Sequence, residues 1–497
     1  MSIKANVFAN FLSQIYAALI GVAMVPVLLR HMGAEAYGLV GFFAMLQGWF
    51  VLLDMGFAAA LSREAARRKG CPETLGELRL LLYGVEKLFF TLAIGGSVLA
   101  LVSASFITEH WLKVEGLPLL EVRDALILMT ITALLRWLSG LYRGVISGLE
   151  RQIWLSLFNI LVVTLRFVAV VPLFIFVSSG SVAFFSYQLA VALLELASLA
   201  WMTRYLLPSS IPSKDAEFRP LHKLAPFAVS MALAVLLWTL ATQIDKLLLS
   251  SMLPLSEYGY FSVAVAAASV VMMLSTPVAT ALLPRLAHLE HQGDAGSVVM
   301  LYRESTQLIS ALSAPAVLIL TCFSEPVLWL WTGDAAVVNK SAPLLALYAA
   351  GYGILVLSGQ PYYVQHAKGD LRLHLLGTSL FILILLPLLF LATKEMGMVG
   401  AGWAWLLVNA LFFFTWVPIA HRHFFPGLHL TWLVKDITPV VLPASLCAAA
   451  MAAWMPWSTE KIWMTVQLAG IALLLSFCAA VGSRRGRHYL QINFAPK

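Results

Sequence analysis

Long apolar stretches in the first half of the sequence carry four ionisable side chains well inside them: Lys87, Arg136, Arg166 and Glu195. Placing such a group at bilayer depth costs at least about 2.5–3.5 kcal/mol, so each requires an opposite charge, a water-filled cavity or a function. Three of the four are cations, and guanidinium groups bind phosphate oxygens through paired hydrogen bonds. The surplus of positive charge therefore predicts a site for an anionic group such as a pyrophosphate.

Polar residues in four of these stretches recur at spacings of three, four or seven, which place them on one helical face. A stripe of this kind does not readily face lipid, so we expect each to line an interior surface. The stripes are Arg136, Gly140, Arg143 and Ser147; Asn159 and Arg166; Asn10 and Gln14; and Gln47 and Asp54. A purely structural alternative remains open, in which Arg136 or Arg166 pairs with Glu195 or Asp54 and holds helices together.

The apolar stretches after Lys246 contain no central lysine, arginine, aspartate or glutamate. They offer instead hydroxyl, amide and aromatic groups, of which Tyr352 and Gln360 suit a neutral hydroxylated ligand such as a sugar. An aromatic belt at the membrane interface is the alternative for other tyrosines of this segment. Asp245 and Lys246 are sequence neighbours that do not share a helical face, and we expect Asp245 to anchor the outer interface.

Signatures of metal binding and catalysis are absent from the sequence. His421, His423 and His429 form a cluster without cysteine or carboxylate company, and the 4 cysteines are scattered. There is no phosphate-cradling glycine loop, no G-x-S-x-G motif and no histidine–carboxylate pair suited to catalysis. We therefore expect no metal, no cofactor and no catalytic residue, and a chain that is not an enzyme.

The composition indicates which elements hold these residues. The chain has 497 residues, of which 61% are hydrophobic and 11% charged, whereas a soluble protein carries about 25% charged residues. We predict an all-α polytopic membrane protein, because runs of about 20 apolar residues can each cross the hydrocarbon core. About fourteen spans are predicted, at 8–29, 38–61, 80–106, 125–147, 152–177, 182–206, 224–247, 257–284, 303–323, 342–365, 373–392, 397–420, 437–456 and 462–482.

The distribution of lysine and arginine predicts the orientation of these spans. If the N-terminus is cytoplasmic, most of the loop lysines and arginines fall on that side, so both termini should be cytoplasmic. The formal net charge of +7 is then explained largely by orientation, and it is weak support for an anionic ligand.

An internal repeat divides the chain. Tyr37 and Gly38 match Tyr258 and Gly259 at an offset of 221 positions, and both copies leave the membrane through an arginine. We predict two pseudo-symmetric six-helix lobes around a central cavity, followed by two further helices. The predicted boundaries are 1–206 for the first lobe, 207–223 for a cytoplasmic linker, 224–420 for the second lobe, and 421–497 for two additional spans and a cytoplasmic tail.

Three short motifs carry a resemblance to a known family. The turn RHMGAEAYG at 30–38, the second-helix segments LDMG at 53–56 and SRE at 62–64, and the matching QIDK at 243–246 with EYG at 257–259 resemble bacterial polysaccharide flippases. These are the O-antigen and exopolysaccharide exporters of the multidrug, oligosaccharidyl-lipid and polysaccharide superfamily. The resemblance implies a multi-pass protein of the bacterial inner membrane that moves undecaprenyl-pyrophosphate-linked oligosaccharide by alternating access.

The resemblance also implies roles for the residues singled out above. Arg136 and Arg166 would contact the pyrophosphate, Arg143 and Arg30 would receive it at the two mouths, and Lys87 is a further candidate. The partners of the protein would be the lipid-linked oligosaccharide, membrane lipids, and the polysaccharide polymerase and chain-length machinery. No nucleic acid would be among them. The other substrate candidates are Asn10, Gln14, Tyr352 and Gln360, and the candidates for coupling or salt bridges are Asp54, Glu195 and Asp245.

Three other functions compete with this one. A multidrug exporter of the same superfamily would favour an acidic cavity for cationic drugs, whereas the first half is basic. A lipid II flippase of that superfamily fits the same topology. A membrane-embedded glycan polymerase or glycosyltransferase usually needs a larger outer loop or catalytic carboxylates at the membrane surface.

Overall fold

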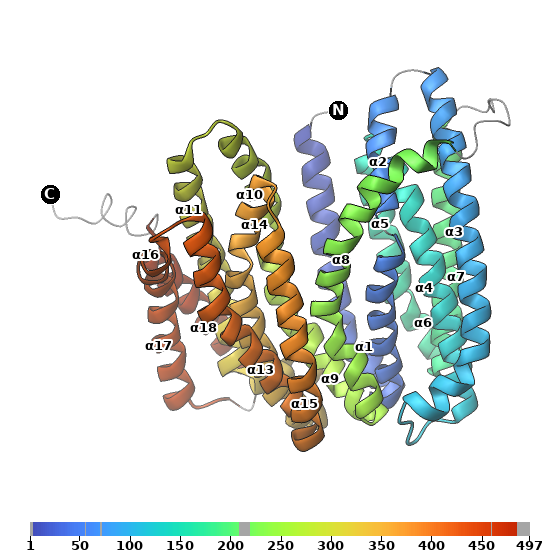
Figure 1. The fold of residues 1–497 in the computed structure, drawn as a ribbon. Helices are drawn as coiled ribbons and strands as arrows, with labels where there is room; N and C mark the ends of the chain where they lie inside the picture. The colour runs from blue at the N-terminus through green and yellow to red at the C-terminus, as the bar shows by residue number, and fades with distance from the viewer. Residues whose placement is uncertain (1–2, 55, 70–71, 208–218, 459, 485–497) are drawn as a thin grey trace. The chain divides into compact units, whose positions relative to one another are not determined.

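A computed structural model of the chain describes residues 3–54, 56–69, 72–207, 219–458 and 460–484. Every secondary-structure element in these ranges is helical (Figure 1). The chain forms two compact units, Met1–Gly259 and Tyr260–Lys497. Each unit has its own apolar core, such as the cluster around Phe89 and Leu141 in the first and the cluster around Tyr302 and Trp432 in the second.

The first unit (blue to green in Figure 1) contains the elements up to the start of α9. These are α1 (Ile3–Phe50), η1 (Val51–Asp54), α2 (Phe57–Arg68), α3 (Pro72–Phe106), η2 (Ile107–Trp111), α4 (Leu119–Gly148), α5 (Gln152–Val163), η3 (Thr164–Val168), α6 (Val170–Phe176), α7 (Ser181–Leu206), α8 (Arg219–Met252) and α9 (Leu255–Ala268).

The second unit begins inside α9 and continues to the end of the described chain. Its other elements are α10 (Val270–His291), α11 (Ala295–Cys322), α12 (Ser324–Thr332), α13 (Ala335–Ser358), α14 (Gln360–Lys368), α15 (Arg372–Phe424), α16 (Leu428–Trp432), η5 (Leu433–Ile437), α17 (Thr438–Trp454) and α18 (Lys461–Gly482).

The helices confirm an all-α polytopic membrane protein with about fourteen spans. Within the described residues, 11 continuous helical segments are long and apolar enough to cross a membrane. Two of them, α1 and α15, each hold two predicted spans, joined across kinks at Gly33 (φ 81°) and Gly397 (φ 60°). A positive φ is readily adopted only by glycine. α8 corresponds to the seventh predicted span.

The predicted linker and the stretch after the span 303–323 can be compared with the described helices. Residues 208–218 of the predicted cytoplasmic linker lie outside the described residues, and α8 begins at Arg219 within the predicted range. The domain boundaries stay a prediction. The stretch between the predicted spans 303–323 and 342–365 contains the nine-residue helix α12, which is too short to span a bilayer.

Helix α3 changes the depth expected for Lys87. It contains 35 residues, about 52 Å at 1.5 Å per residue, which exceeds the roughly 30 Å hydrocarbon core. The uninterrupted apolar run within it is 88–106, directly after Lys87. Lys87 therefore lies at the end of this run and not in its middle, and its side chain is exposed.

The repeated Tyr-Gly motifs meet each other inside the first unit. A Cβ atom on Gly38 would lie 2.3 Å from the carbonyl oxygen of Leu255, and one on Gly259 would lie 2.1 Å from that of Ala34. Ala34 and Leu255 are related by the same 221-position offset as the two glycines. The two copies of the repeat thus cross through reciprocal contacts that only glycine permits.

The loop between η2 and α4 is hydrogen-bonded to both copies at this crossing. The Glu35 carboxylate accepts the backbone N–H groups of Glu115 (2.7 Å) and Gly116 (3.0 Å). Ser256, which matches Glu35 in the repeat, donates its hydroxyl to the Glu115 carboxylate (3.0 Å). The loop therefore fastens α1 to α9, which explains why the motif carries a polar residue three positions before its glycine.

This crossing predicts a position-specific loss of stability. Gly38→Val or Gly259→Val should lower the melting temperature of the detergent-solubilised protein, because overpacking a close helix contact costs roughly 1–3 kcal/mol. Gly21→Val on α1 is the matched control, since nothing lies within 4 Å of its Cβ position. If Gly38→Val has the same melting temperature as the Gly21→Val control, the crossing is not tightly packed.

Candidate binding site

Four charged side chains of the first unit form one group, here called the arginine cluster. Its members are Arg136, Arg143, Arg166 and Glu195. Glu195 on α7 is the carboxylate at its centre, and its side chain is only 2% exposed. Arg143 Nη2 lies 2.6 Å from Glu195 Oε1, and Arg166 Nη2 pairs with Glu195 Oε2. One buried carboxylate is therefore shared by two guanidinium groups from different elements.

Two side-chain contacts at the cluster join α4 to α7. Arg136 donates from Nη2 to Gln188 Oε1 at 2.6 Å, and seven residues later on both helices Arg143 pairs with Glu195. Seven residues are two helical turns, so the two contacts lie on one face of each helix. Arg136 also donates from Nη1 to Gln47 Oε1 of α1 at 2.9 Å.

Arg166 lies in η3, a π-helical turn between α5 and α6. Such turns leave backbone groups outside the regular ladder and are frequent at functional sites. Gln188 Nε2 donates to the Arg166 carbonyl oxygen (2.8 Å), and the Tyr187 hydroxyl donates to that of Leu165 (2.6 Å). α7 thus supports the turn that directs Arg166 toward Glu195.

Polar contacts with α1 complete the surroundings of the cluster. Asn159 Nδ2 donates to Ser13 Oγ at 2.9 Å, while its Oδ1 lies 3.5 Å from Arg143 Nη1. One turn along, the hydroxyls of Tyr16 and Thr164 are 2.7 Å apart. α1 therefore adjoins α5 and η3 through Ser13 and Tyr16, and these contacts do not involve the predicted stripe of Asn10 and Gln14.

The charge of the cluster is unbalanced. Within the described residues, Arg136 makes no ion pair, and it donates hydrogen bonds to two neutral amides, Gln47 and Gln188. Three guanidinium groups and one carboxylate give the cluster a net charge of two positive units.

The cluster is also accessible on its cationic side. The side chains of Arg143 and Arg166 remain 27% and 19% exposed, against 2% for Glu195. In the described part of the chain, the buried Nε atoms of Arg136 and Arg166 have no hydrogen-bond partner. Glu195 therefore forms the closed side of the group, while unused donors and surplus charge remain for an anion.

The sequence predicted some members of this group and misplaced others. Glu195 pairs with Arg166, as the structural alternative expected, and additionally with Arg143. Asp54 instead accepts the backbone N–H of Ala58 at 3.2 Å and caps α2. Gln47 was noted as part of a stripe, but nothing in the sequence marked Gln188 as its counterpart on α7.

Four further candidates lie apart from these contacts. Arg30 is exposed on α1, 14 residues beyond Tyr16 and thus about 21 Å along the helix. Asn10 is half-buried and Gln14 exposed on the same helix, and Lys87 is exposed on α3. Their roles in binding stay predictions.

Asp245 and Lys246 form an ion pair although they do not share a helical face. Lys246 Nζ lies 3.1 Å from Asp245 Oδ1 and also donates to the Thr242 carbonyl oxygen at 2.6 Å. The four-carbon stem of lysine lets its ammonium group fold back along α8, so sequence neighbours pair although their Cβ atoms diverge. Asp245 is fully buried.

The two polar candidates of the second unit lie in its interior. Tyr352 is 7% exposed and its ring packs against Trp405 with centroids 5.4 Å apart. Gln360 is 1% exposed and donates to the Val356 carbonyl oxygen at 3.3 Å. Sugar binding by these residues stays a prediction.

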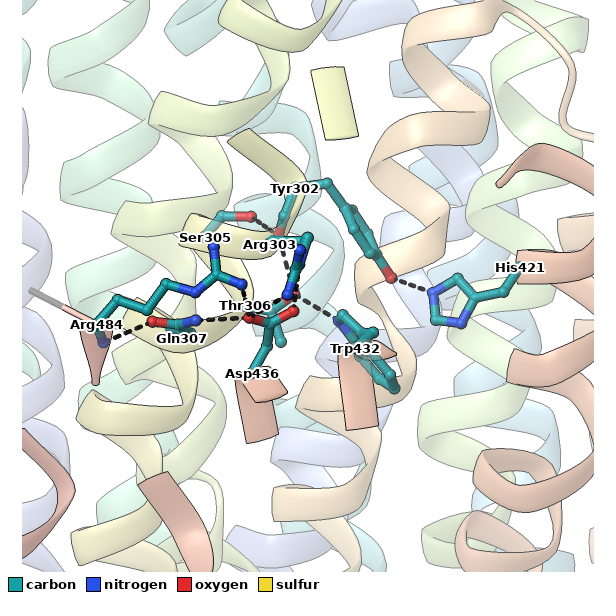
Figure 2. Close-up of polar contacts among 9 residues, drawn as sticks. All are labelled: Tyr302, Arg303, Ser305, Thr306, Gln307, His421, Trp432, Asp436 and Arg484. Atoms are coloured by element: carbon teal, nitrogen blue, oxygen red, sulfur yellow. Dashed lines mark hydrogen bonds and ion pairs between the residues drawn. The ribbon is translucent and has the colours of Figure 1, made fainter. Parts of the chain in front are cut away.

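A second buried carboxylate, Asp436 in the π-turn η5, was not predicted. Figure 2 shows that Arg303 of α11 contacts both its oxygens, with Nε–Oδ2 at 2.6 Å and Nη2–Oδ1 at 3.2 Å. Gln307 (2.6 Å) and Arg484 (3.1 Å) contact Oδ1 as well. Asp436 thus ties the last two spans to α11. Its position at the end of a predicted span concealed it.

Beside this carboxylate, two of the three clustered histidines are hydrogen-bonded to each other. His421 Nδ1 lies 2.9 Å from His429 Nδ1, and the Tyr302 hydroxyl lies 2.7 Å from His421 Nε2 (Figure 2). Trp432 Nε1 donates to the Thr306 hydroxyl at 2.9 Å. These contacts hold α15 and α16 against α11.

Comparison with known proteins identifies relatives over most of the chain. Residues 3–290 match the family described as "Polysaccharide biosynthesis protein". The "Uncharacterized membrane protein EpsK" of Bacillus subtilis (strain 168) is 21% identical over 97% of this chain and 94% of its own length.

Solved structures share the fold. A lipid II flippase MurJ in an inward closed conformation aligns with a TM-score of 0.74 at 13% identity, over 96% of this chain and 98% of its own. An inward-facing multidrug resistance MATE family transporter of the MOP superfamily aligns with a TM-score of 0.67 at 14% identity, over 82% and 94%. The chain therefore shares the fold of these two proteins.

The Asp436 contacts predict a stability effect in the second unit. Asp436→Asn should destabilise the protein by about 1–3 kcal/mol, less than for a fully buried pair because Arg303 and Arg484 keep 18% and 43% exposure. Thermal melting in detergent measures it. Asp124→Asn, at the exposed Arg123 pair, is the control; equal melting of the two variants would contradict the anchoring role.

Proposed function

Because the chain belongs to the polysaccharide biosynthesis protein family, we propose that it is a flippase for lipid-linked oligosaccharide. It moves undecaprenyl-pyrophosphate-linked oligosaccharide from the inner to the outer leaflet of the bacterial inner membrane, for O-antigen or exopolysaccharide biosynthesis. Both termini lie in the cytoplasm. The polysaccharide polymerase and chain-length machinery then act on the delivered glycan.

The arginine cluster is the observation that carries this proposal. A neutral glycan has no charge that would require cations inside a membrane protein, whereas a pyrophosphate linkage carries two negative charges. Arg143 and Arg166 supply planar donors whose side chains remain 27% and 19% exposed, and Arg136 adds a third guanidinium group. Since all three belong to long apolar helices, the charge lies where a pyrophosphate group would otherwise be poorly solvated.

Transport by alternating access requires that the ligand is bound and then released. The cluster suits both steps, because its guanidinium groups are oriented by Glu195, Gln47 and Gln188 before any ligand arrives. Preorganised donors reduce the ordering cost of binding. Partial exposure of Arg143 and Arg166 leaves them hydrated, which limits the affinity to a level that permits release.

A multidrug exporter is the main competing function within this fold. Its cationic substrates would be repelled by the surplus positive charge of the arginine cluster, so we favour an anionic substrate. A lipid II flippase shares the pyrophosphate and would use the same arginines. Complementation of separate strains deficient in glycan export or in lipid II transport distinguishes these two substrates, and drug-resistance assays test the exporter.

Removal of either central arginine should abolish export. Arg136→Ala and Arg166→Ala should each fail to restore surface glycan in a flippase-deficient strain at normal protein level, because each loses a phosphate contact. Arg123→Ala, at an exposed pair outside the cluster, should restore export. Full complementation by both alanine variants would refute the cationic site.

Lysine replacements separate charge from hydrogen-bonding geometry. Arg136→Lys and Arg166→Lys should retain part of the export, since an ammonium group preserves the charge but not the planar fork. The rate of glycan appearance at the cell surface measures this. Lysine variants as inactive as the alanine variants would show that fork geometry, and not charge, dominates.

A further inference from the structure

The backbone of η3 departs from an α-helix by one residue. In a regular α-helix the N–H of Ala169 would bond the carbonyl oxygen of Leu165, four residues earlier. Here it donates to the carbonyl oxygen of Thr164, five residues earlier, at 3.0 Å. The Leu165 carbonyl oxygen is thereby released from its usual partner. Inside a membrane such a group needs another donor from the protein itself, because no bulk water can solvate it.

Pro172 of α6 explains why the chain does not continue as a regular helix at this point. Proline has no N–H, and in an α-helix its ring clashes with the carbonyl oxygen four residues earlier, here that of Val168. In membrane helices, neighbouring side chains and local π-helical adjustments compensate for such a proline. Pro172 therefore favours an irregular turn before it, but proline alone does not determine the register of that turn.

Two consecutive residues of α7 bond the backbone of the turn. The Tyr187 hydroxyl donates to the released Leu165 carbonyl oxygen at 2.6 Å. Gln188 Nε2 donates to the Arg166 carbonyl oxygen at 2.8 Å. Gln188 is 2% exposed and accepts from Arg136 through its other amide atom, Oε1. The orientation of this amide is therefore fixed, since flipping it would break both bonds.

The register of the turn determines the direction of the Arg166 side chain. A shift of one residue along a helix rotates a side chain by about 100° around the helix axis. In the present register the guanidinium group pairs with Glu195, which lies two helical turns beyond Gln188 on α7. A rotation of that size would direct the group away from Glu195 and out of the arginine cluster.

We infer that Tyr187 and Gln188 are positioning residues that hold η3 in its π-helical register and so present Arg166 to the ligand. The inference rests on the proposed function. Each residue acts through a backbone carbonyl oxygen of the turn, so its effect on the ligand passes through Arg166. Breaking the two bonds allows the turn to change register and removes Arg166 from the site.

Three substitutions separate these contacts. Tyr187→Phe removes one hydroxyl, changes no charge and leaves the contacts of Arg136 in place. Gln188→Met removes the bond to the turn together with the bond to Arg136. Gln47→Met is the matched control for Gln188→Met, because Gln47 also accepts from Arg136 but does so from α1.

The first experiment reports the direction of residue 166 without any ligand. The full chain in liposomes carries Arg166→Cys, with its 4 native cysteines replaced by alanine. A neutral, water-soluble methanethiosulfonate should label the introduced thiol, because the Arg166 side chain is 19% exposed. Adding Tyr187→Phe and Gln188→Met together should slow labelling at least about threefold, since two hydrogen bonds that favour this register are lost. Adding Gln47→Met should leave the labelling rate unchanged.

The second experiment asks whether the effect on the ligand passes through Arg166. The affinity of the full chain in nanodiscs is measured for a fluorescent short-chain polyprenyl diphosphate disaccharide. Tyr187→Phe should weaken binding about threefold to tenfold, the usual worth of one hydrogen bond. In an Arg166→Ala background the same substitution should change the affinity by less than about 1.5-fold, because the group that it positions is absent.

The outcomes separate the inference from the function beneath it. The inference is overturned if Arg166→Cys is not labelled, or if the double variant is labelled as fast as the Gln47→Met control. Equal losses of affinity from Tyr187→Phe with and without Arg166 also overturn it, because the hydroxyl would then act on general stability. Wild-type protein that does not bind the diphosphate compound contradicts the proposed function, and the labelling rates then still show whether α7 holds the turn.

Discussion

The shared ion pairing of Glu195 is the constraint on which the site depends. A buried carboxylate is tolerated only when opposite charge and hydrogen bonds compensate its lost hydration, and here Arg143 and Arg166 do so together. The pairing fixes α4, α7 and the η3 turn against one another. It also leaves Arg136 supported by amides alone, so the same contacts that stabilise the bundle maintain its positive surplus.

The second unit shows a different use of a buried acid. Asp436 is surrounded by Arg303, Arg484 and Gln307 and joins the last two spans to α11. There these partners of the acid are arginines and an amide that contact it directly, and Arg303 and Arg484 keep 18% and 43% exposure, which reduces the electrostatic penalty. In the first unit Arg136 has no acid as a partner within the described residues, and an unneeded cation in a long apolar helix would be costly. The balance of charge therefore distinguishes the anchoring cluster from the candidate binding site.

Much of this architecture could be predicted from the sequence, because a bilayer constrains length and polarity strongly. The spans, the polar positions Arg136 and Arg143 on α4 and Asn159 on α5, and the unusual status of Arg166 and Glu195 followed from periodicity and charge. The Tyr-Gly repeat was visible as well, although its reciprocal crossing through Gly38 and Gly259 required coordinates.

The other features depend on which helices are neighbours, on local backbone geometry and on side-chain conformation. A sequence pattern does not specify these. Gln188 resembles any other polar residue until α7 is placed beside α4, and the π-turn at Arg166 follows from a local shift in backbone bonding. Lys246 could fold back onto Asp245 because its side chain is flexible. Lys87 lies in α3, which is longer than a bilayer requires, so its place within the membrane stays a prediction.

The most direct test of the central claim is a structure of the full chain with a short-chain polyprenyl diphosphate disaccharide bound. The account predicts phosphate oxygens within hydrogen-bonding distance of the guanidinium groups of Arg136 and Arg166, with Glu195 still paired to Arg143. A diphosphate bound away from these arginines, with Arg136 contacting only Gln47 and Gln188, would contradict it.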